Sequence, residues 1–405
     1  MSVEAGKNTD RDNRLTRYAA LGTAIFVISA LALTVFATAS ECTRDAIILD
    51  PFSFPSAPND LTGRGYTGDT VALMLIDKLQ SIASKAQTLK KTETFSHGEM
   101  TPNVKIGETG FTLDAVVRLV RTAFKIPERH IFGEVTQQQG ELAITIWFSG
   151  HAISSGMHSD LSAAVDDVAA QLMIILDPYV MARYLYEVGR TDDALKLLIQ
   201  SISERPDEMP WAWNLWGGIL AEKGHLEEAI HHFRIAEQSV MKTDSIGAKL
   251  GILSERDRQI LWITHYNWGR AVFQRATEGD INPSTFAWME ESENQFTKVI
   301  QWNMGMPNTH VAMSRYMLGL VLFWRCNNDA AATNFRAALA ADPTLSDALV
   351  YLGYISVRNE KFEEAQDLFD QAIAANPGPG NDLAWRTKAG YRPKPATEGW
   401  CLRTH

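Results

Sequence analysis

The sequence predicts a mainly helical protein, a solenoid of stacked helix pairs preceded by a small α/β domain and a single N-terminal transmembrane helix. Three observations predict this fold class. The stretch from about 177 to 377 repeats itself every 34 or 35 residues. Residues 45–170 mix strand-like and helix-like patterns. Upstream, residues 18–39 form a run of 22 residues without a charge.

Small residues mark the repeat. Ala194 and Ala229 are 35 residues apart, and Ala331 and Ala365 are 34 apart. A bulky apolar residue follows each alanine four positions later, as Leu198, Phe233, Phe335 and Phe369. Upstream, a glycine follows a large residue at Gly217, Gly269, Gly319 and Gly353. A small residue where two helices cross lets their backbones approach, and one pair cannot bury its apolar face alone. Several stacked pairs are therefore expected.

With this period and these positions, the stretch resembles the tetratricopeptide repeat (TPR) family, in which each repeat is a helix pair. We expect five repeats within 175–379, at about 175–208, 210–243, 262–307, 312–345 and 346–379. The third is irregular, because an insertion at 277–287 displaces its second helix. The tail at 380–405 is rich in proline and glycine, so it cannot be a sixth repeat and is expected at most to cap the solenoid.

The resemblance implies a concave groove, lined by the first helix of each repeat, that binds a protein partner. The side chains placed there are mostly Tyr, Trp, Phe and Arg, types that anchor protein interfaces. They are Tyr179, Arg183, Tyr186, Trp211, Asn214, Tyr266, Arg270, Phe273, Tyr316, Phe323, Trp324, Tyr354 and Arg358. Among them, Arg183, Asn214 and Arg270 could hold a peptide carboxylate. The alternative is that several merely pack between adjacent first helices.

Residues 45–170 predict a small α/β domain. We expect a strand at 47–49, helices at 71–82 and from Thr112, and a hairpin of 132–135 with 142–148. Residues 84–108 are polar and show no pattern typical of a helix or a strand. A helix expected at 161–176 runs into the first repeat. With Ile47 to Phe52 and the hairpin segments, this order resembles the amino-terminal domain of TolB-like proteins, which often stands beside TPR arrays in bacterial envelope proteins.

The uncharged run at 18–39 would form a helix of about 33 Å, enough for a hydrocarbon core of about 30 Å. Four basic residues lie in the segment 1–17, and only Arg44 lies in the twenty after the run. The N-terminus is therefore expected to be cytoplasmic and the rest exported. The run is longer than the apolar core of a signal peptide, which favours a retained anchor over cleavage after Ala39. The pattern Ala20-x-x-x-Ala24 could pair two such helices in a homodimer.

Charge and motifs exclude several function classes. Without 1–17, the totals of 38 basic and 48 acidic residues become 34 and 45, a net charge of −11 that repels nucleic acid. Neither a phosphate-binding loop around Gly107 nor a nucleophile elbow around Ser155 is complete. We expect no catalytic residue and no cofactor. No acceptor site for N-glycosylation occurs, which favours a bacterial periplasm over a secretory lumen.

The histidines and cysteines do not predict a metal site or a set of disulfide bonds. His151, His158 and Asp160 could hold a metal only in a loop without fixed geometry, so a solvated loop and no metal site are expected. Three cysteines are too few for a disulfide framework. We expect Cys326 to be a small core residue, and a bridge between Cys42 and Cys401 is conceivable if both are exported.

The function that these features predict is a non-catalytic TPR scaffold, anchored in the bacterial inner membrane, which binds protein partners on the periplasmic side. The alternative is an envelope signalling component, whose α/β domain binds a small ligand and relays this through the repeats. A third class, an enzyme using the loop at His151 and His158, has the weakest basis.

Overall fold

The computed structural model describes residues 46–54, 65–97, 129–204, 209–241, 253–278, 283–302 and 306–377. These residues divide into two compact units, of which the first contains the residues up to Lys85 and Thr92–Asp177. The second contains Pro178 onward together with the short segment Ala86–Lys91. The expected membrane run 18–39, the helix expected from Thr112 and the tail 380–405 lie outside the described residues. Each unit is described by itself.

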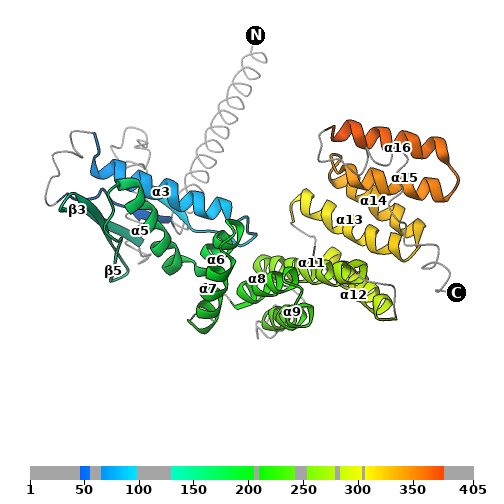
Figure 1. Ribbon diagram of the computed structural model, residues 1–405, viewed down its shortest axis with the longest axis horizontal. Helices are drawn as coiled ribbons and strands as arrows, with labels where there is room; N and C mark the ends of the chain where they lie inside the picture. The colour runs from blue at the N-terminus through cyan, green and yellow to red at the C-terminus, as the bar shows by residue number, and fades with distance from the viewer. Residues whose placement is uncertain are drawn as a thin grey trace, which may run out of the picture. The chain divides into compact units, whose positions relative to one another are not determined.

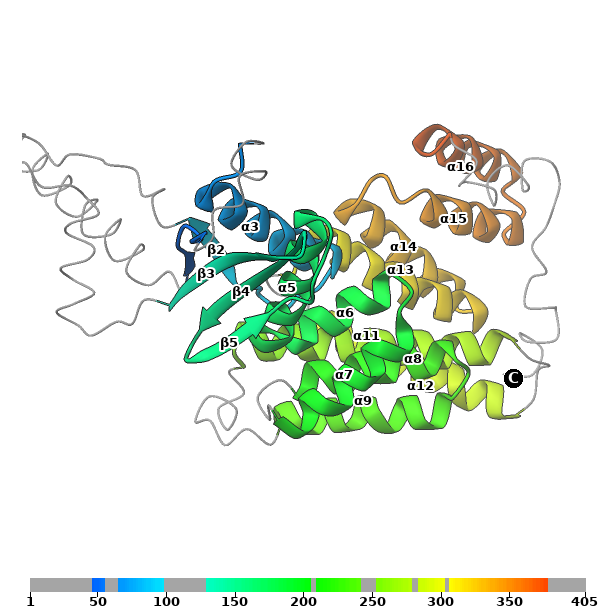
Figure 2. The same ribbon diagram turned by 60° about the vertical axis from the view of Figure 1, so that its left-hand side comes forward.

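The first unit contains a five-stranded sheet in the order β2-β1-β3-β4-β5. Strand β1 (Ala46–Leu49) runs parallel to β2 (Thr94–His97) and to β3 (Arg129–Gln138). The strands β4 (Glu141–Phe148) and β5 (His151–Ser154) continue the sheet antiparallel (Figure 2). Gln139 and Gly140 join β3 to β4 with φ values of 51° and 87°, the left-handed pair that a two-residue hairpin turn requires.

Two of these strands correct the sequence-based expectation. β2 lies within residues 84–108, where the sequence carries no signal, and β5 begins at His151, where the sequence predicts a loop. Both are four residues long, and β2 has a single apolar residue while the two apolar residues of β5 are adjacent, so neither shows the alternation by which strands are recognised.

Helices α3 (Gly68–Lys85) and α5 (Leu161–Leu176) pack against each other and against the sheet (Figures 1 and 2). Alternate residues of β4, such as Ile144 and Ile146, are fully buried. The side chains between them point the other way, so that Trp147 is 40% exposed beside the 56% exposed Phe132 of β3. The pleat of the hairpin therefore separates a buried face from a more exposed one.

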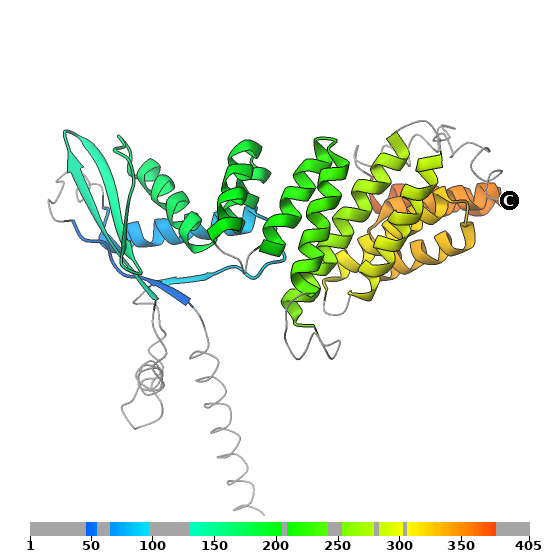
Figure 3. The ribbon, with the colours of Figure 1, turned by 90° about the horizontal axis from the view of Figure 1, so that it is seen from below.

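The second unit is a series of helix pairs in which each helix lies alongside the next (Figure 3). The pairs are α6 (Pro178–Glu187) with α7 (Thr191–Glu204), α8 (Met209–Glu222) with α9 (Leu226–Met241), α11 (Glu255–Glu278) with α12 (Pro283–Gln301), α13 (Asn308–Trp324) with α14 (Asn328–Ala341), and α15 (Ser346–Arg358) with α16 (Phe362–Ala375). Among the described residues, no helix combines the length and the apolar character needed to cross a bilayer.

A contact between glycine and phenylalanine holds the helices of a pair together. A Cβ atom on Gly319 of α13 would lie 2.6 Å from Cε1 of Phe335 on α14. The same close approach joins Gly217 to Phe233, Gly269 to Phe296 and Gly353 to Phe369. Each phenylalanine thus lies against bare backbone. In the irregular third pair, Ser292 takes the place of the repeated alanine, and its hydroxyl donates to the Gly269 carbonyl at 3.0 Å.

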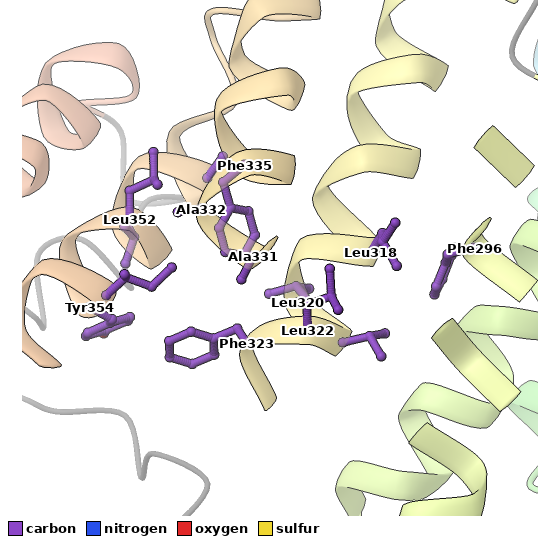
Figure 4. Close-up of a cluster of buried hydrophobic side chains, with 14 of the residues drawn as sticks. Phe296, Leu318, Leu320, Leu322, Phe323, Ala331, Ala332, Phe335, Leu352 and Tyr354 are labelled. Carbon is purple, nitrogen blue, oxygen red and sulfur yellow. The ribbon is translucent and has the colours of Figure 1, made fainter. Parts of the chain in front are cut away.

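These contacts belong to a core that runs through α11 to α16. Figure 4 shows part of this core, with Phe296 of α12 beside Leu318 of α13, and with Phe335 of α14 on the side of Leu352 of α15. Cys326 follows α13 and corrects an expectation, because it is only half-buried and forms a disulfide. The other two cysteines, Cys42 and Cys401, lie outside the described residues.

We predict that Gly319→Ala lowers the free energy of unfolding by about 1–3 kcal/mol, because the added methyl group overlaps the Phe335 ring. Gly218→Ala is the matched control. A Cβ atom on Gly218 meets nothing within 4 Å, so alanine should stabilise its helix by up to about 1 kcal/mol. Urea unfolding measures both changes.

A second substitution tests whether overlap with the Phe335 ring causes the loss of stability in Gly319→Ala. The first pair has Ala182 and Leu198 at the positions of Gly319 and Phe335, and both are fully buried. Adding Phe335→Leu to Gly319→Ala should therefore recover part of the loss. If the two single losses simply add, overlap with the ring is not the reason for the glycine.

Candidate functional site

The second unit contains a cavity of about 390 Å³ on the side formed by the first helices of its pairs. Its wall consists of α6, α8 and α11, with His310 of α13 and residues 87–89. The lining residues are Gln87, Thr88, Leu89, Tyr179, Arg183, Tyr186, Glu187, Trp211, Asn214, Leu215, Gly218, Ile219, Ala221, Glu222, Ile263, Tyr266, Asn267, Arg270, Ala271, Gln274 and His310. We call this cavity the pocket.

The structure brings together seven of the residues that the sequence placed in a groove. They are Tyr179, Arg183, Tyr186, Trp211, Asn214, Tyr266 and Arg270. On each helix they are spaced three or four residues apart, which puts them on one face. Tyr179 of α6 and Trp211 of α8 are buried and pack against each other, with ring centroids 5.6 Å apart and the ring planes tilted by 40°.

The remaining candidates do not line the pocket. Tyr316 packs beside Phe335, with centroids 5.9 Å apart. The Arg358 guanidinium lies 4.0 Å from the centroid of Phe323 and donates to Asn328 Oδ1 at 3.0 Å. Three further candidates, Phe273, Trp324 and Tyr354, also make ring contacts with neighbouring aromatics. For this set, the structure favours the alternative that they pack between helices.

The three residues expected to hold a carboxylate differ in what they already bind. Arg183 donates from Nε to the Ala86 carbonyl at 3.2 Å and pairs with Glu187. Asn214 donates to Thr264 Oγ1 at 3.1 Å and accepts from Asn267 at 3.0 Å. Both are therefore committed to internal contacts.

Arg270 is different. Its guanidinium lies 5.9 Å from the Tyr266 ring centroid, and no carboxylate among the described residues pairs with it. Arg270 is exposed, whereas Tyr266 beneath it is half-buried. Arg270 thus gives the pocket a cation that can bind an anionic group.

A tyrosine and a glutamate form a second polar feature of the wall. The Tyr186 hydroxyl donates to the Glu222 carboxylate. Burial, together with that carboxylate, raises the pKa of Tyr186 to about 12. The phenol therefore stays protonated at neutral pH and keeps Glu222 engaged as an acceptor.

The segment 86–91, which we call the strap, supplies the part of the wall outside the helix pairs. Thr88 Oγ1 donates to the Tyr179 hydroxyl at 3.3 Å, and Lys90 Nζ lies 5.7 Å from the centroid of the same ring. Leu89 packs against the core that contains Trp262. Gln87 has a φ of 45°, which residues other than glycine rarely adopt. Sequence reasoning missed the strap, because a short polar segment without periodicity gives no signal.

The chain matches one known family. The family model of the tetratricopeptide repeat matches residues 179–241 and 316–379. These two segments are tetratricopeptide repeats. They cover α6 to α9 and most of α13 to α16, while α11 and α12 lie outside both matches. The pocket therefore uses the first helices of two matched TPRs and the long helix α11 of the irregular third pair.

Solved TPR structures also resemble the chain. YrrB, described as a TPR protein with an unusual peptide-binding site, is 17% identical and covers 55% of this chain and 98% of its own, with a TM-score of 0.37. TTC0263, a TPR protein of Thermus thermophilus, is 18% identical and covers 53% of this chain and 96% of its own, with a TM-score of 0.37. MamA of Desulfovibrio magneticus RS-1 is 15% identical and covers 51% of this chain and 95% of its own, with a TM-score of 0.37. TM-scores this low carry no conclusion about this chain. No curated protein matches it.

The residues that the sequence offers for a metal have separate local partners in the first unit. Asp160 accepts from the Ala163 N–H as the N-cap of α5. His158 Nε2 lies 2.9 Å from Asp167 Oδ2, and His151 Nδ1 lies 3.2 Å from the Ser149 carbonyl. Within the described part of the chain, no three His, Cys, Asp or Glu side chains are placed to hold a metal ion.

A buried polar network positions α11 behind the pocket. His265 Nδ1 lies 2.7 Å from Gln295 Oε1 of α12, and its Nε2 lies 3.5 Å from the Glu237 carboxylate of α9. Lys298 also pairs with Glu237 at 3.4 Å. Burial lowers the pKa of His265, while Glu237 opposes this shift. The neutral imidazole is therefore the form that the folded repeats accept.

We predict that the protein loses stability as the pH falls below about 6.5, the ordinary histidine pKa. The unfolded chain takes up the proton first, because the folded-state pKa of His265 is lower. His265→Gln should reduce the difference in unfolding free energy between pH 7.5 and pH 5.5. Equal pH dependence of the wild type and His265→Gln would contradict this role.

Proposed function

We propose that this protein is a non-catalytic scaffold whose TPR pocket binds a segment of a partner protein. One observation carries the proposal, namely a pocket on the first-helix side of the pairs that gathers Tyr, Trp and Arg side chains. These residue types dominate the energetics of protein interfaces. The pocket spans three successive first helices, so it offers a continuous track rather than a single point of contact.

The charge within the pocket favours an acidic segment. Arg183 is balanced by Glu187, and Glu222 accepts a hydrogen bond from Tyr186. Arg270 has no acidic partner among the described residues. An Asp or Glu side chain of a partner, or its C-terminal carboxylate, would supply the missing acidic group. A guanidinium can bind such a group through two hydrogen bonds.

The proposed location is the periplasmic face of a bacterial inner membrane, with residues 18–39 as the anchor. The length of this run and the excess of basic residues before it support the proposal. The disulfide at Cys326 also supports it, because such bonds form and persist in oxidising compartments.

We predict that a photo-crosslinking amino acid at Gly218, within the pocket, captures one defined partner in the native host. The same amino acid at Gln238, an exposed position of α9, is the matched control and should capture none. Adding Arg270→Glu should abolish the Gly218 adduct, because it replaces the available cation with an anion. Adducts of equal yield from both positions, or an adduct indifferent to Arg270→Glu, would contradict a pocket-based scaffold.

The location has its own test. We predict that the full-length protein stays in the membrane fraction after a carbonate wash, and that protease added to spheroplasts digests the region after residue 40. Deletion of 18–39 should release the protein from the membrane, because it removes the apolar span. Extraction of the full-length protein by carbonate would contradict a spanning anchor.

A further inference from the structure

We infer that Cys326 is joined to Cys401, so that the tail is fastened to the turn between α13 and α14 and caps the end of the helix series. This inference does not depend on the pocket. It assigns the partner of the Cys326 disulfide and gives a role to a segment that lies outside the repeats.

The turn at Cys326 does not itself require a cysteine. Cys326 has a φ of 62°, and its N–H donates to the carbonyl three residues earlier, at the end of α13. The matching turns of three other pairs contain Gly189, Gly224 and Glu360, with φ values of 82°, 82° and 60°. Glycine suits this left-handed conformation best. The sulfur, rather than the turn, therefore explains the cysteine at this position.

Two cysteines remain as the partner of Cys326, because the sequence has three. Cys401 belongs to the same compact unit as Cys326, whereas Cys42 belongs to the first unit. Cys42 is only four positions from Ala46, where β1 begins, so a bond to it would fasten the turn to the sheet of the first unit. A bond to Cys401 can close as the second unit folds, without requiring the two units to meet.

The helices fix where the tail leaves the series. Short turns join α13 to α16 in order, so successive helices run in opposite directions (Figure 1). Arg358, at the end of α15, donates to Asn328 Oδ1, at the start of α14, at 3.0 Å. The turn at Cys326 and the turn before α16 therefore lie at the same end of the helices. α16 then runs away from this end for 14 residues, or about 21 Å.

The tail is long enough to return to this end. The 24 positions from Pro377 to Cys401 can span about 79 Å, several times the length of α16. A bond from Cys401 to Cys326 would therefore bring the tail back along the last helices, and this path makes it a cap.

The bond would stabilise the last two pairs. Among the described residues, α16 ends the series, so no further pair packs against it. Cys326 and Cys401 are 75 positions apart, and a link between them limits the conformations of the unfolded chain. Its formation removes two protons and two electrons from the two thiols, which a disulfide oxidant takes up as it becomes a dithiol. The cap is therefore fastened only where such an oxidant is present.

Peptide mapping tests the connection. The full-length protein is purified from its native host in detergent, after free thiols have been blocked with N-ethylmaleimide, and is digested with trypsin without reduction. Trypsin cleaves after Lys and Arg but not before Pro, so Cys326 should lie in the peptide 326–336 and Cys401 in the peptide 389–403. We expect these two peptides to be linked. A blocked Cys326 thiol, or a link from 326–336 to any other peptide, such as 18–44 with Cys42, would overturn the inference.

Urea unfolding tests the cap. Cys401→Ser should lower the urea midpoint, and dithiothreitol should lower the midpoint of the wild type to the same value without changing that of Cys401→Ser. Cys42→Ser is the matched control and should behave as the wild type does, with and without dithiothreitol. If Cys42→Ser, and not Cys401→Ser, removes the effect of dithiothreitol, the pairing is wrong. A wild-type midpoint that dithiothreitol leaves unchanged would refute the cap.

Discussion

The contact between a glycine on one helix and a phenylalanine on the next is the constraint on which the repeats depend. It recurs at Gly217, Gly269, Gly319 and Gly353, and at each the ring lies where a Cβ atom would be. The contact sets how closely the two helices of a pair approach. Two of the three helices that line the pocket, α8 and α11, carry such a glycine, at Gly217 and Gly269. The contact therefore fixes the packing of helices that also carry pocket residues.

This constraint explains why the repeats could be predicted from the sequence. Glycine, alanine and phenylalanine must recur at fixed intervals wherever the contact occurs, so the period is visible without a structure. Even the third pair, which lies outside the family match, keeps Gly269 and Phe296. The membrane anchor remains a prediction, because residues 18–39 lie outside the described residues. The TolB-like resemblance also remains a prediction, because the family match covers only residues 179–241 and 316–379.

The candidate site was predictable only in part, for a physical reason. The face of a first helix follows from spacing, which is why Tyr179, Arg183 and Arg270 meet in one pocket. What each side chain binds depends on residues far away in sequence, such as Ala86, 97 positions before Arg183. Tyr316 and Arg358 occupy first helices as well, but neighbouring aromatic rings and Asn328 surround them. Spacing alone cannot distinguish these environments.

The strap also has a consequence for folding. The two helices of a pair are close in sequence, and such local contacts form quickly. The bonds from Ala86 and Thr88 to Arg183 and Tyr179 instead span 97 and 91 residues. Closing a loop of that length costs entropy, so these bonds should form late, after the first pair has folded. The ribosome, however, releases the strap before α6 emerges. This part of the pocket wall is thus synthesised before the helices, but it should reach its place only after they have folded. The pocket would therefore be complete for a partner only when these long-range bonds have formed.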